Sequence, residues 1–297
     1  MNANDTKPSD AAAPGFLRSC WDKRELLGML AGRNLKIRYK GSALGFFWSL
    51  LTPLVMIAIY AVFAGVLGLR RELMGLGGAS FNYLPFLVVG VVTWQFTAGS
   101  LSDSLYAIAG NANLVKKVYF PRIILPASTV VANTVNFLLT FLILLAYLGL
   151  TGALRPAGLA WLLPAFGLHF LLCMGVAFLV STLNVFFRDT EHIVGLALLA
   201  WFFLSPVMYE TSLQLTAAKN VLPGSMCGLV FLNPMTGVLA MYRKALMGMD
   251  LMPVVNPETG AALDPAWLLL SLAGALLVLL AGALVLRAGN RRFGDVL

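Results

Sequence analysis

Long runs without a charged residue dominate the chain, and short polar stretches separate them. A helix needs about 20 apolar residues to cross a bilayer. Uncharged windows of about this length predict spans at roughly 44–69, 82–102, 123–154, 156–187, 193–209 and 265–286. The pattern therefore predicts an all-α polytopic membrane protein with six transmembrane helices.

A seventh uncharged window covers residues 221–242, but Pro223, Gly224 and the pair Asn233-Pro234 interrupt it. Backbone that leaves helical geometry at membrane depth is tolerated only where protein or a cavity covers it. We therefore expect a re-entrant external segment before the last span instead of another crossing.

The distribution of positive charge predicts the orientation. With six crossings both ends of the chain lie on one side, and that side carries 15 of the 21 Lys and Arg residues. Because cytoplasmic loops are the ones enriched in Lys and Arg, both termini should be cytoplasmic. A seventh crossing would move the basic C-terminal tail outside.

Composition agrees with a membrane protein. Of the 297 residues, 59% are hydrophobic and 11% are charged, whereas soluble domains carry about 25% charged residues, and the mean hydropathy is +0.84. We predict a disordered cytoplasmic tail at 1–15, one transmembrane domain at 16–290 and a cytoplasmic C-terminal tail at 291–297. The three scattered cysteines indicate neither a disulfide framework nor a metal site. The net charge of +8 follows the predicted topology, so it does not indicate nucleic-acid binding.

The loop between the second and third predicted spans has the sequence NLVKKVYFPR, residues 113–122. Its spacing puts the aliphatic residues on one face of a short helix and the two lysines on another, and the proline should end it. About two helical turns are not stable alone in water, so this helix needs a surface. The loop is either an inside loop that holds the topology and touches anionic lipid, or a docking helix for a soluble partner.

A stripe of uncharged polar residues runs along the third predicted span. Thr129, Asn133, Asn136 and Thr140 fall within an arc of about 60° on a helix. Asparagine amides that faced lipid would lack hydrogen-bond partners. The stripe is therefore either a hydrogen-bonded seam between helices or a wall of a translocation path.

Other polar side chains at membrane depth have the same two interpretations. Tyr60, Trp94, Gln95 and His169 either pack between helices or line a path. An ionisable residue such as His169 is a functional candidate by default at this depth. The charged turn at 188–191 forms a local ion-pair cluster or contacts a partner.

Four segments together resemble the export permeases of the ABC-2 type, in the branch that exports O-antigen, teichoic acid and capsule polysaccharides. They are LAGRNLKIRYKGSALGFFWSLLTPL (30–54), NLVKKVYFPRIILP (113–126), FFRDTEHI (186–193) and LNPMTGVLAMYRKAL (232–246). The resemblance covers roughly residues 16–290. It implies an inner-membrane permease that works as a homodimer with two copies of a separate ATPase subunit and moves lipid-linked polysaccharide outward.

The resemblance also implies roles for particular residues. The short helix between spans 2 and 3 is the coupling helix that sits in a groove of the ATPase, and its residues here are Asn113, Leu114, Val115, Lys116, Lys117, Val118 and Tyr119. An amphipathic helix at about 21–40 lies along the cytoplasmic membrane interface as a gate, with the basic residues Arg24, Arg33, Lys36 and Arg38.

The periodicity of this interface helix supports the assignment in part. Leu26, Leu27, Leu30 and Ile37 share one arc of the helix, but Arg33 falls beside it.

The sequence contains no G-x-x-x-x-G-K-[ST] phosphate loop. ATP and magnesium would therefore be bound by the partner ATPase, and we expect no catalytic residue, metal or cofactor in this chain. The alternatives are an ABC-2 exporter of another substrate, such as teichoic acid, capsule, lipid or a drug, or a membrane enzyme or scaffold outside the family. Six spans without a central carboxylate count against a proton-coupled or sodium-coupled carrier.

Overall fold

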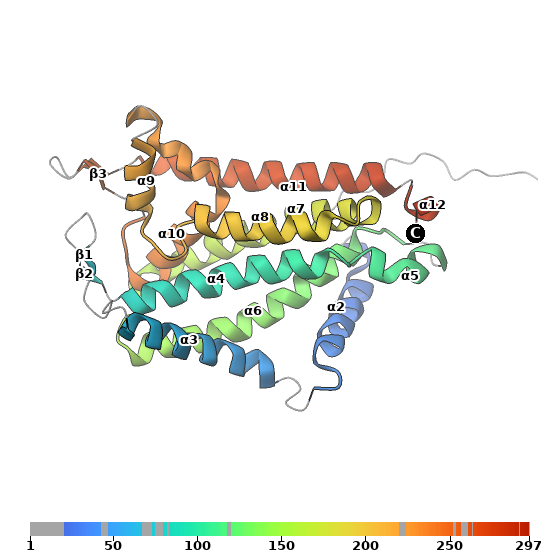
Figure 1. Cartoon of the computed structure of the whole chain (residues 1–297), viewed down its shortest axis with the longest axis horizontal. Helices are drawn as coiled ribbons and strands as arrows, with labels where there is room; N and C mark the ends of the chain where they lie inside the picture. Colours follow the sequence, from blue (N-terminus) through green and yellow to red (C-terminus); the bar gives the residue numbers. More distant parts are fainter. Residues whose placement is uncertain are drawn as a thin grey trace, which may run out of the picture.

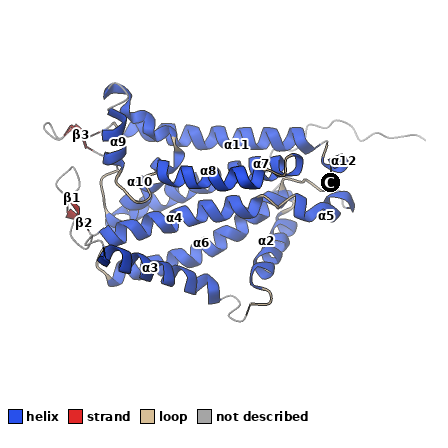
Figure 2. Cartoon of the chain, viewed as in Figure 1, coloured by secondary structure: helices blue, strands red, loops and turns tan. Residues whose placement is uncertain are grey.

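A computed structural model describes residues 21–42, 47–66, 73–74, 80–81, 83–117, 120–219, 224–251, 254–256, 261–262, 264–290 and 292–296. The predicted tail at 1–15 lies outside the described residues, as do Val118 and Tyr119 of the predicted coupling helix. The described chain is predominantly helical (Figure 2). The all-α prediction is confirmed, apart from two small strand pairs in loops.

A bundle of helices runs along the long axis of the molecule (Figure 1). It consists of α3 (Trp48–Val66), α4 (Tyr83–Ser104), α6 (Ile124–Leu150), α7 (Leu162–Phe186), α8 (Thr190–Leu204) and α11 (Leu268–Asn290). Each of these helices coincides with one predicted window.

Among the described residues, four helices are long and apolar enough to cross a membrane. They are α4, α6, α7 together with the preceding turn η3 (Pro156–Trp161), and α11 together with η5 (Pro265–Trp267). The helices α3 and α8 contribute shorter apolar stretches, Leu51–Val62 and Thr190–Leu204. Large side chains such as Leu196, Leu269 and Val62 point outward with more than half of their surface exposed, which suits helices that face lipid.

Two glycines let α7 and α11 pack with their backbones in contact. A Cβ atom added at Gly282 would lie 2.2 Å from the carbonyl oxygen of Gly175, and one added at Gly175 would lie 2.5 Å from the backbone nitrogen of Leu279. Small residues at such contacts are the usual means by which membrane helices approach closely. This pair forms the most extensive helix contact in the described bundle.

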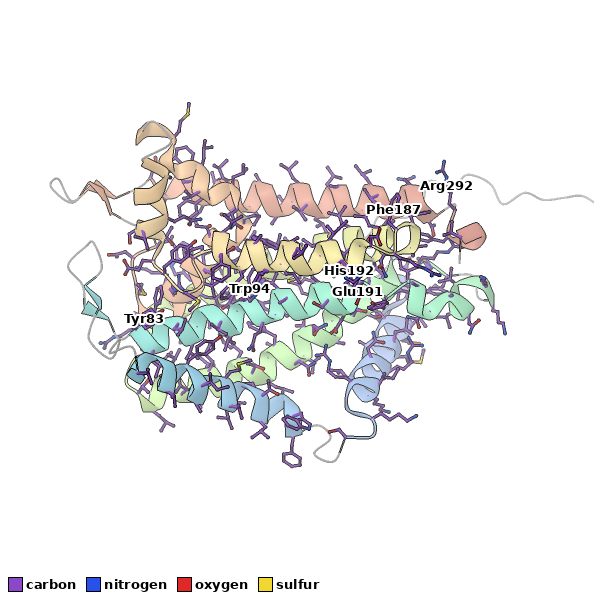
Figure 3. All side chains as sticks on the ribbon, viewed as in Figure 1. Tyr83, Trp94, Phe187, Glu191, His192 and Arg292 are labelled. Carbon is purple, nitrogen blue, oxygen red and sulfur yellow. The ribbon has the colours of Figure 1, made fainter. Side chains whose placement is uncertain are left out.

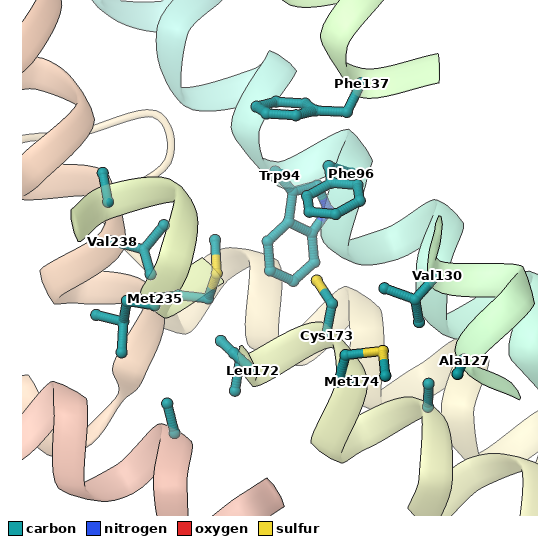
Figure 4. Close-up of a cluster of buried hydrophobic side chains, with 14 of the residues drawn as sticks. Trp94, Phe96, Ala127, Val130, Phe137, Leu172, Cys173, Met174, Met235 and Val238 are labelled. Carbon is teal, nitrogen blue, oxygen red and sulfur yellow. The ribbon is translucent and has the colours of Figure 1, made fainter. Parts of the chain in front are cut away.

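Aromatic and aliphatic side chains fill the centre of the bundle (Figure 4). The ring of Phe96 on α4 stacks on that of Phe137 on α6 with the centroids 4.8 Å apart. Trp94, Cys173 and Met235 are also buried there. The core therefore joins α4, α6 and α7 to the segment that follows α9.

The two ends of the bundle differ (Figure 1). At one end, called the α5 end below, lie α2 (Arg24–Tyr39), α5 (Ala112–Lys117) and α12 (Phe293–Val296). At the opposite end, called the α9 end, lie α9 (Thr211–Lys219) and two antiparallel strand pairs. These are β1 (Leu73–Met74) with β2 (Ser80–Phe81), and β3 (Val254–Asn256) with β4 (Ala261–Ala262).

The predicted interrupted window forms a hairpin of η4 (Gly224–Leu232) and α10 (Pro234–Met247). Asn233 turns the chain, since its side chain accepts a hydrogen bond from the backbone of Met235 and caps α10, while proline occupies the first helical turn. At the tip, the sulfur of Met235 reaches the Thr97 hydroxyl within the bundle at 3.5 Å. The end of α10 returns to the loop between α6 and α7, where Leu246 accepts from the backbone of Arg155 at 2.8 Å.

Candidate functional site

A polar groove lies between α2, α4 and α6 toward the α5 end. Two adjoining cavities of about 440 Å³ and 270 Å³ form it, and both are lined by Arg38, Asn133 and Asn136. The first also borders α2 and the end of α4, and the second borders α3. The groove therefore extends from the α5 end into the bundle.

Asn133 of α6 connects the charged residues at the mouth of the groove. Its side-chain amide donates to Asp103 of α4 at 2.8 Å, and its carbonyl oxygen accepts from Arg38 of α2 at 3.1 Å. Arg38 and Asp103 also form a salt bridge, with 35% and 39% of their side chains exposed. A pair this exposed contributes little to stability by itself, but together with Asn133 it joins three helices at one point.

The helix α2 faces α6 with a side that begins apolar and becomes polar. Leu30 and Ala31 are buried, and one turn further the amide of Asn34 donates to the hydroxyls of Ser128 and Thr129 at 3.4 and 3.5 Å. Ile37, which the periodicity grouped with the buried leucines, is 60% exposed. Polar contacts with α6 replace apolar ones along the last two turns of α2.

The predicted polar stripe lies along this groove. Thr129, Asn133, Asn136 and Thr140 each line one or both cavities, and Gln95 of α4 faces them across the inner one. Thr129 and Thr140 also donate to carbonyl oxygens of their own helix. The residues present neutral hydrogen-bonding groups to a cavity that extends between helices.

Trp94 and His169 lie elsewhere. Trp94 makes edge contacts with Trp201 and Phe202 of α8 at 5.7 and 5.5 Å between centroids. The His169 ring is fully buried, 2.7 Å from the Thr97 hydroxyl and next to the Phe96 ring. Phe96 also lines the groove, so an aromatic layer separates His169 from it. Sequence reasoning grouped these residues with Asn133, whereas the structure puts them in the core.

Tyr60 of α3 is half-buried and packs against the hydrophobic core. Both Trp94 and Tyr60 are thus at least partly buried against the core. Of the two path candidates on α4, Trp94 and Gln95, Gln95 is the one that lines the groove.

A short helix, α5, lies where the coupling helix is predicted, and a turn of 3₁₀ helix, η2 (Ala109–Asn111), precedes it. Val115 is buried and Leu114 is half-buried, while Asn113, Lys116 and Lys117 are exposed. The side-chain oxygen of Asn111 accepts from Arg33 of α2 at 2.5 Å. The helix thus rests on its aliphatic face and presents its lysines outward at the α5 end.

The basic residues of α2 have different surroundings. Arg33 and Arg38 contact Asn111, Asp103 and Asn133 as described above, whereas Arg24 stacks over the exposed Trp21 ring at 5.7 Å and Lys36 is exposed.

The first turn of α8 carries a second polar cluster. Tyr106, which follows α4, donates to Glu191, and this hydrogen bond raises the pKa of the Tyr106 hydroxyl. A cavity of about 610 Å³ borders Tyr106, Glu191 and His192. Figure 3 shows Glu191 and His192 toward the end of the bundle that also carries Arg292.

Arg243 of α10 is buried toward the α9 end. Its guanidinium donates to the carbonyl oxygens of Pro206 and Val207 at 2.7 and 2.8 Å and lies 3.6 Å from the Phe86 ring centre. Gly90 allows this approach, because a Cβ there would lie 2.2 Å from the Val207 oxygen. Arg243 thus fixes α10 to the segment that follows α8.

Comparison with known proteins assigns the family. The profile of the ABC-2 type transporter family matches residues 25–247, which include α5, the α10 hairpin and all of α2 except its first residue. The chain belongs to the ABC-2 type transporter family. It is 32% identical over 226 residues to the "O-antigen export system permease protein RfbA" of Klebsiella pneumoniae, covering 75% of this chain and 80% of that protein.

A protein of the same name from Myxococcus xanthus is 32% identical over 230 residues, which cover 77% of this ABC-2 chain and 82% of the relative. The family assignment and the apolar helices establish a multi-pass membrane protein that is a permease subunit of a transporter.

Sequence reasoning missed several members of the site. Asp103 comes directly after the uncharged window at 82–102, and its partner Arg38 lies 65 positions away in the chain. Tyr106 carried no signal, because its contact comes from a helix that is distant in sequence.

Proposed function

We propose that this chain is the permease subunit of an exporter that moves a lipid-linked, O-antigen-like polysaccharide from the cytoplasm across the bacterial inner membrane. Its relatives are named as O-antigen export permeases. The observation that carries the substrate class is the groove, because a hydroxyl-rich polymer needs exchangeable hydrogen bonds and the groove interior offers amide and hydroxyl groups.

In this proposal the α5 end is cytoplasmic and the six bundle helices cross the membrane. The basic residues of α2, α5 and the C-terminal segment then face the cytoplasm. The hairpin of η4 and α10 enters from outside and returns. α8 spans about 22 Å at 1.5 Å per residue, so the segment that follows it would complete its crossing.

The path runs along the stripe of α6. Gln95, Asn133 and Asn136 contact the sugar, and the aromatic residues Phe96 and Phe137 form the inner wall of the groove. Two copies of the chain form a homodimer, and the path opens between them.

The driving force comes from a separate ATPase subunit, which binds ATP and magnesium. The lysines of α5 face that partner, with one ATPase subunit on each copy of the permease. Movement of α5 would reach α2 through Arg33 and Asn111, which are in contact. α2 lies along the membrane interface and closes the groove mouth through Arg38 and Asp103, so a shift of α2 opens the mouth.

The test is depletion of the protein in its host, followed by chemical identification of what accumulates on the cytoplasmic side of the membrane. Accumulation of a lipid-linked polysaccharide is the expected result. Accumulation of a teichoic acid, a lipid or a drug would keep the exporter and reject the substrate class. Normal export of every surface polymer after depletion would contradict the proposed function.

A further inference from the structure

The helix α5 is too short to hold its own orientation. It contains six residues, and helices of this length are not stable in water without tertiary contacts. The turn η2, directly before α5, is held by α2 through the hydrogen bond between Arg33 and Asn111. A further contact comes from the C-terminal helix α12, which packs against α5 and α7 (Figure 1).

The C-terminal segment is fixed by Phe293. Its side chain is fully buried, and its ring centre lies 5.8 Å from that of Phe186 at the end of α7. The chain can turn back so tightly after α11 because Gly289 has no side chain. A Cβ there would lie 2.8 Å from Thr182 and 3.1 Å from the Phe293 ring.

Arg122 connects this anchor to the loop that carries α5. Its guanidinium carbon lies 5.6 Å from the centre of the Phe293 ring, within the range of a cation–π contact. The same guanidinium donates to the carbonyl oxygen of Asn290, at the end of α11. Because Arg122 lies between α5 and α6 in the chain, the cluster of Arg122, Phe186 and Phe293 joins the α5 loop to the ends of α7 and α11.

We propose that Phe293 is a positioning residue, which holds α5 in the orientation from which it contacts the ATPase and ties α5 to α7 and α11. The C-terminal end is then a functional part of the coupling machinery. This inference rests on the proposed docking of an ATPase on α5. A displacement of α5 would then be transmitted by two separate routes. One leads through Arg122 and Phe293 to α11, and the other leads through Asn111 to α2.

The experiment measures the position of α5 directly. A photoreactive amino acid replaces the exposed Lys117, the chain is co-expressed with its ATPase subunit, and the yield of the crosslink to that subunit is quantified in membranes. Phe293→Ala should lower the yield roughly 3- to 30-fold, the range expected for residues within an energetic coupling network. Phe293→Leu should recover part of it, since leucine retains an apolar anchor.

Two further variants separate positioning from general stability. Val296→Ala lies on the same helix at an exposed site and should leave the yield unchanged. Arg122→Gln removes the charge over the ring, and in combination with Phe293→Ala the loss should be smaller than the product of the two single losses, because the two residues share one contact. The thermal midpoint of each purified permease is measured in parallel.

The outcomes test the role of Phe293 separately from the docking of the ATPase on α5. If Leu114→Asp abolishes the crosslink but Phe293→Ala and Arg122→Gln leave it unchanged, the role of Phe293 is rejected and the docking stands. A lower thermal midpoint with an unchanged crosslink would also reject it, since Phe293 would then only stabilise the bundle. No crosslink from Lys117 in the otherwise unchanged chain would reject the docking itself, and the inference with it.

Discussion

The side chain of Asn133 makes three polar contacts. Its amide group donates to Asp103 at 2.8 Å and to the Thr129 carbonyl at 3.1 Å, and its oxygen accepts from Arg38 at 3.1 Å. A single side chain therefore connects α2, α4 and α6 where the groove begins.

Asn133→Leu should slow export, because it leaves the Arg38–Asp103 pair without its bridging amide and removes a polar contact for sugar. We expect a loss of roughly 3- to 30-fold, which corresponds to about 0.6–2 kcal/mol for one interhelical hydrogen bond in a membrane. Surface polysaccharide is measured in cells at matched permease abundance. The control is Thr134→Val, since that hydroxyl donates to its own helix at Val130. Equal export by the two variants would mean that Asn133 has no part in the path.

The polar residues of the groove were predictable only within one helix. The spacing of Thr129, Asn133 and Asn136 was enough to put them on one side of α6. The same reasoning could not tell that Gln95 faces the groove while Trp94 faces α8. Periodicity gives the direction of a side chain around α4, but it does not say which neighbouring helix lies in that direction. The Arg38–Asp103 contact requires the end of α2 to lie close to the end of α4, which no local pattern encodes.

At the scale of elements, the contact between α7 and α11 depends on glycine. Gly282→Ala should destabilise the purified permease by about 1–3 kcal/mol, as overpacking of a tight interface does, because its Cβ would meet the carbonyl oxygen of Gly175. Thermal unfolding is the measurement. Gly167→Ala on α7 is the matched control, since nothing lies within 4 Å of its Cβ position. An unchanged midpoint for Gly282→Ala would show that the two helices are further apart than described.

The elements themselves were predicted better than their faces. Long uncharged windows yielded the bundle helices because burial and lipid exposure both select apolar residues. The face of α2 that packs against the bundle was only partly predicted, since Ile37 is exposed while Asn34 and Arg38 face α6. The strand pairs β1–β2 and β3–β4 were missed because each strand has only two or three residues.

At the scale of the whole molecule, the orientation in the membrane is a prediction from charge. A reporter that is active only outside the cytoplasm, fused after residue 297, should be inactive. In the same chain, a cysteine in place of Lys244 on α10 should react with an impermeant reagent added from outside. Labelling of that cysteine only from the cytoplasm, or activity of the reporter, would contradict the six crossings and the re-entrant hairpin.

The measurement that tests the central claim most directly is transport by the purified complex. The permease and its ATPase are reconstituted into vesicles that contain the host's lipid-linked polysaccharide on the ATPase side, and polymer that reaches the opposite side is detected with a glycosidase enclosed in the lumen. We predict that the polymer is cleaved only with ATP and magnesium, and that Leu114→Asp, which puts a charge on the aliphatic face by which α5 rests on the bundle, abolishes cleavage. Cleavage at the same rate without ATP, or no cleavage by a complex that hydrolyses ATP and is supplied with this polymer, would contradict the account.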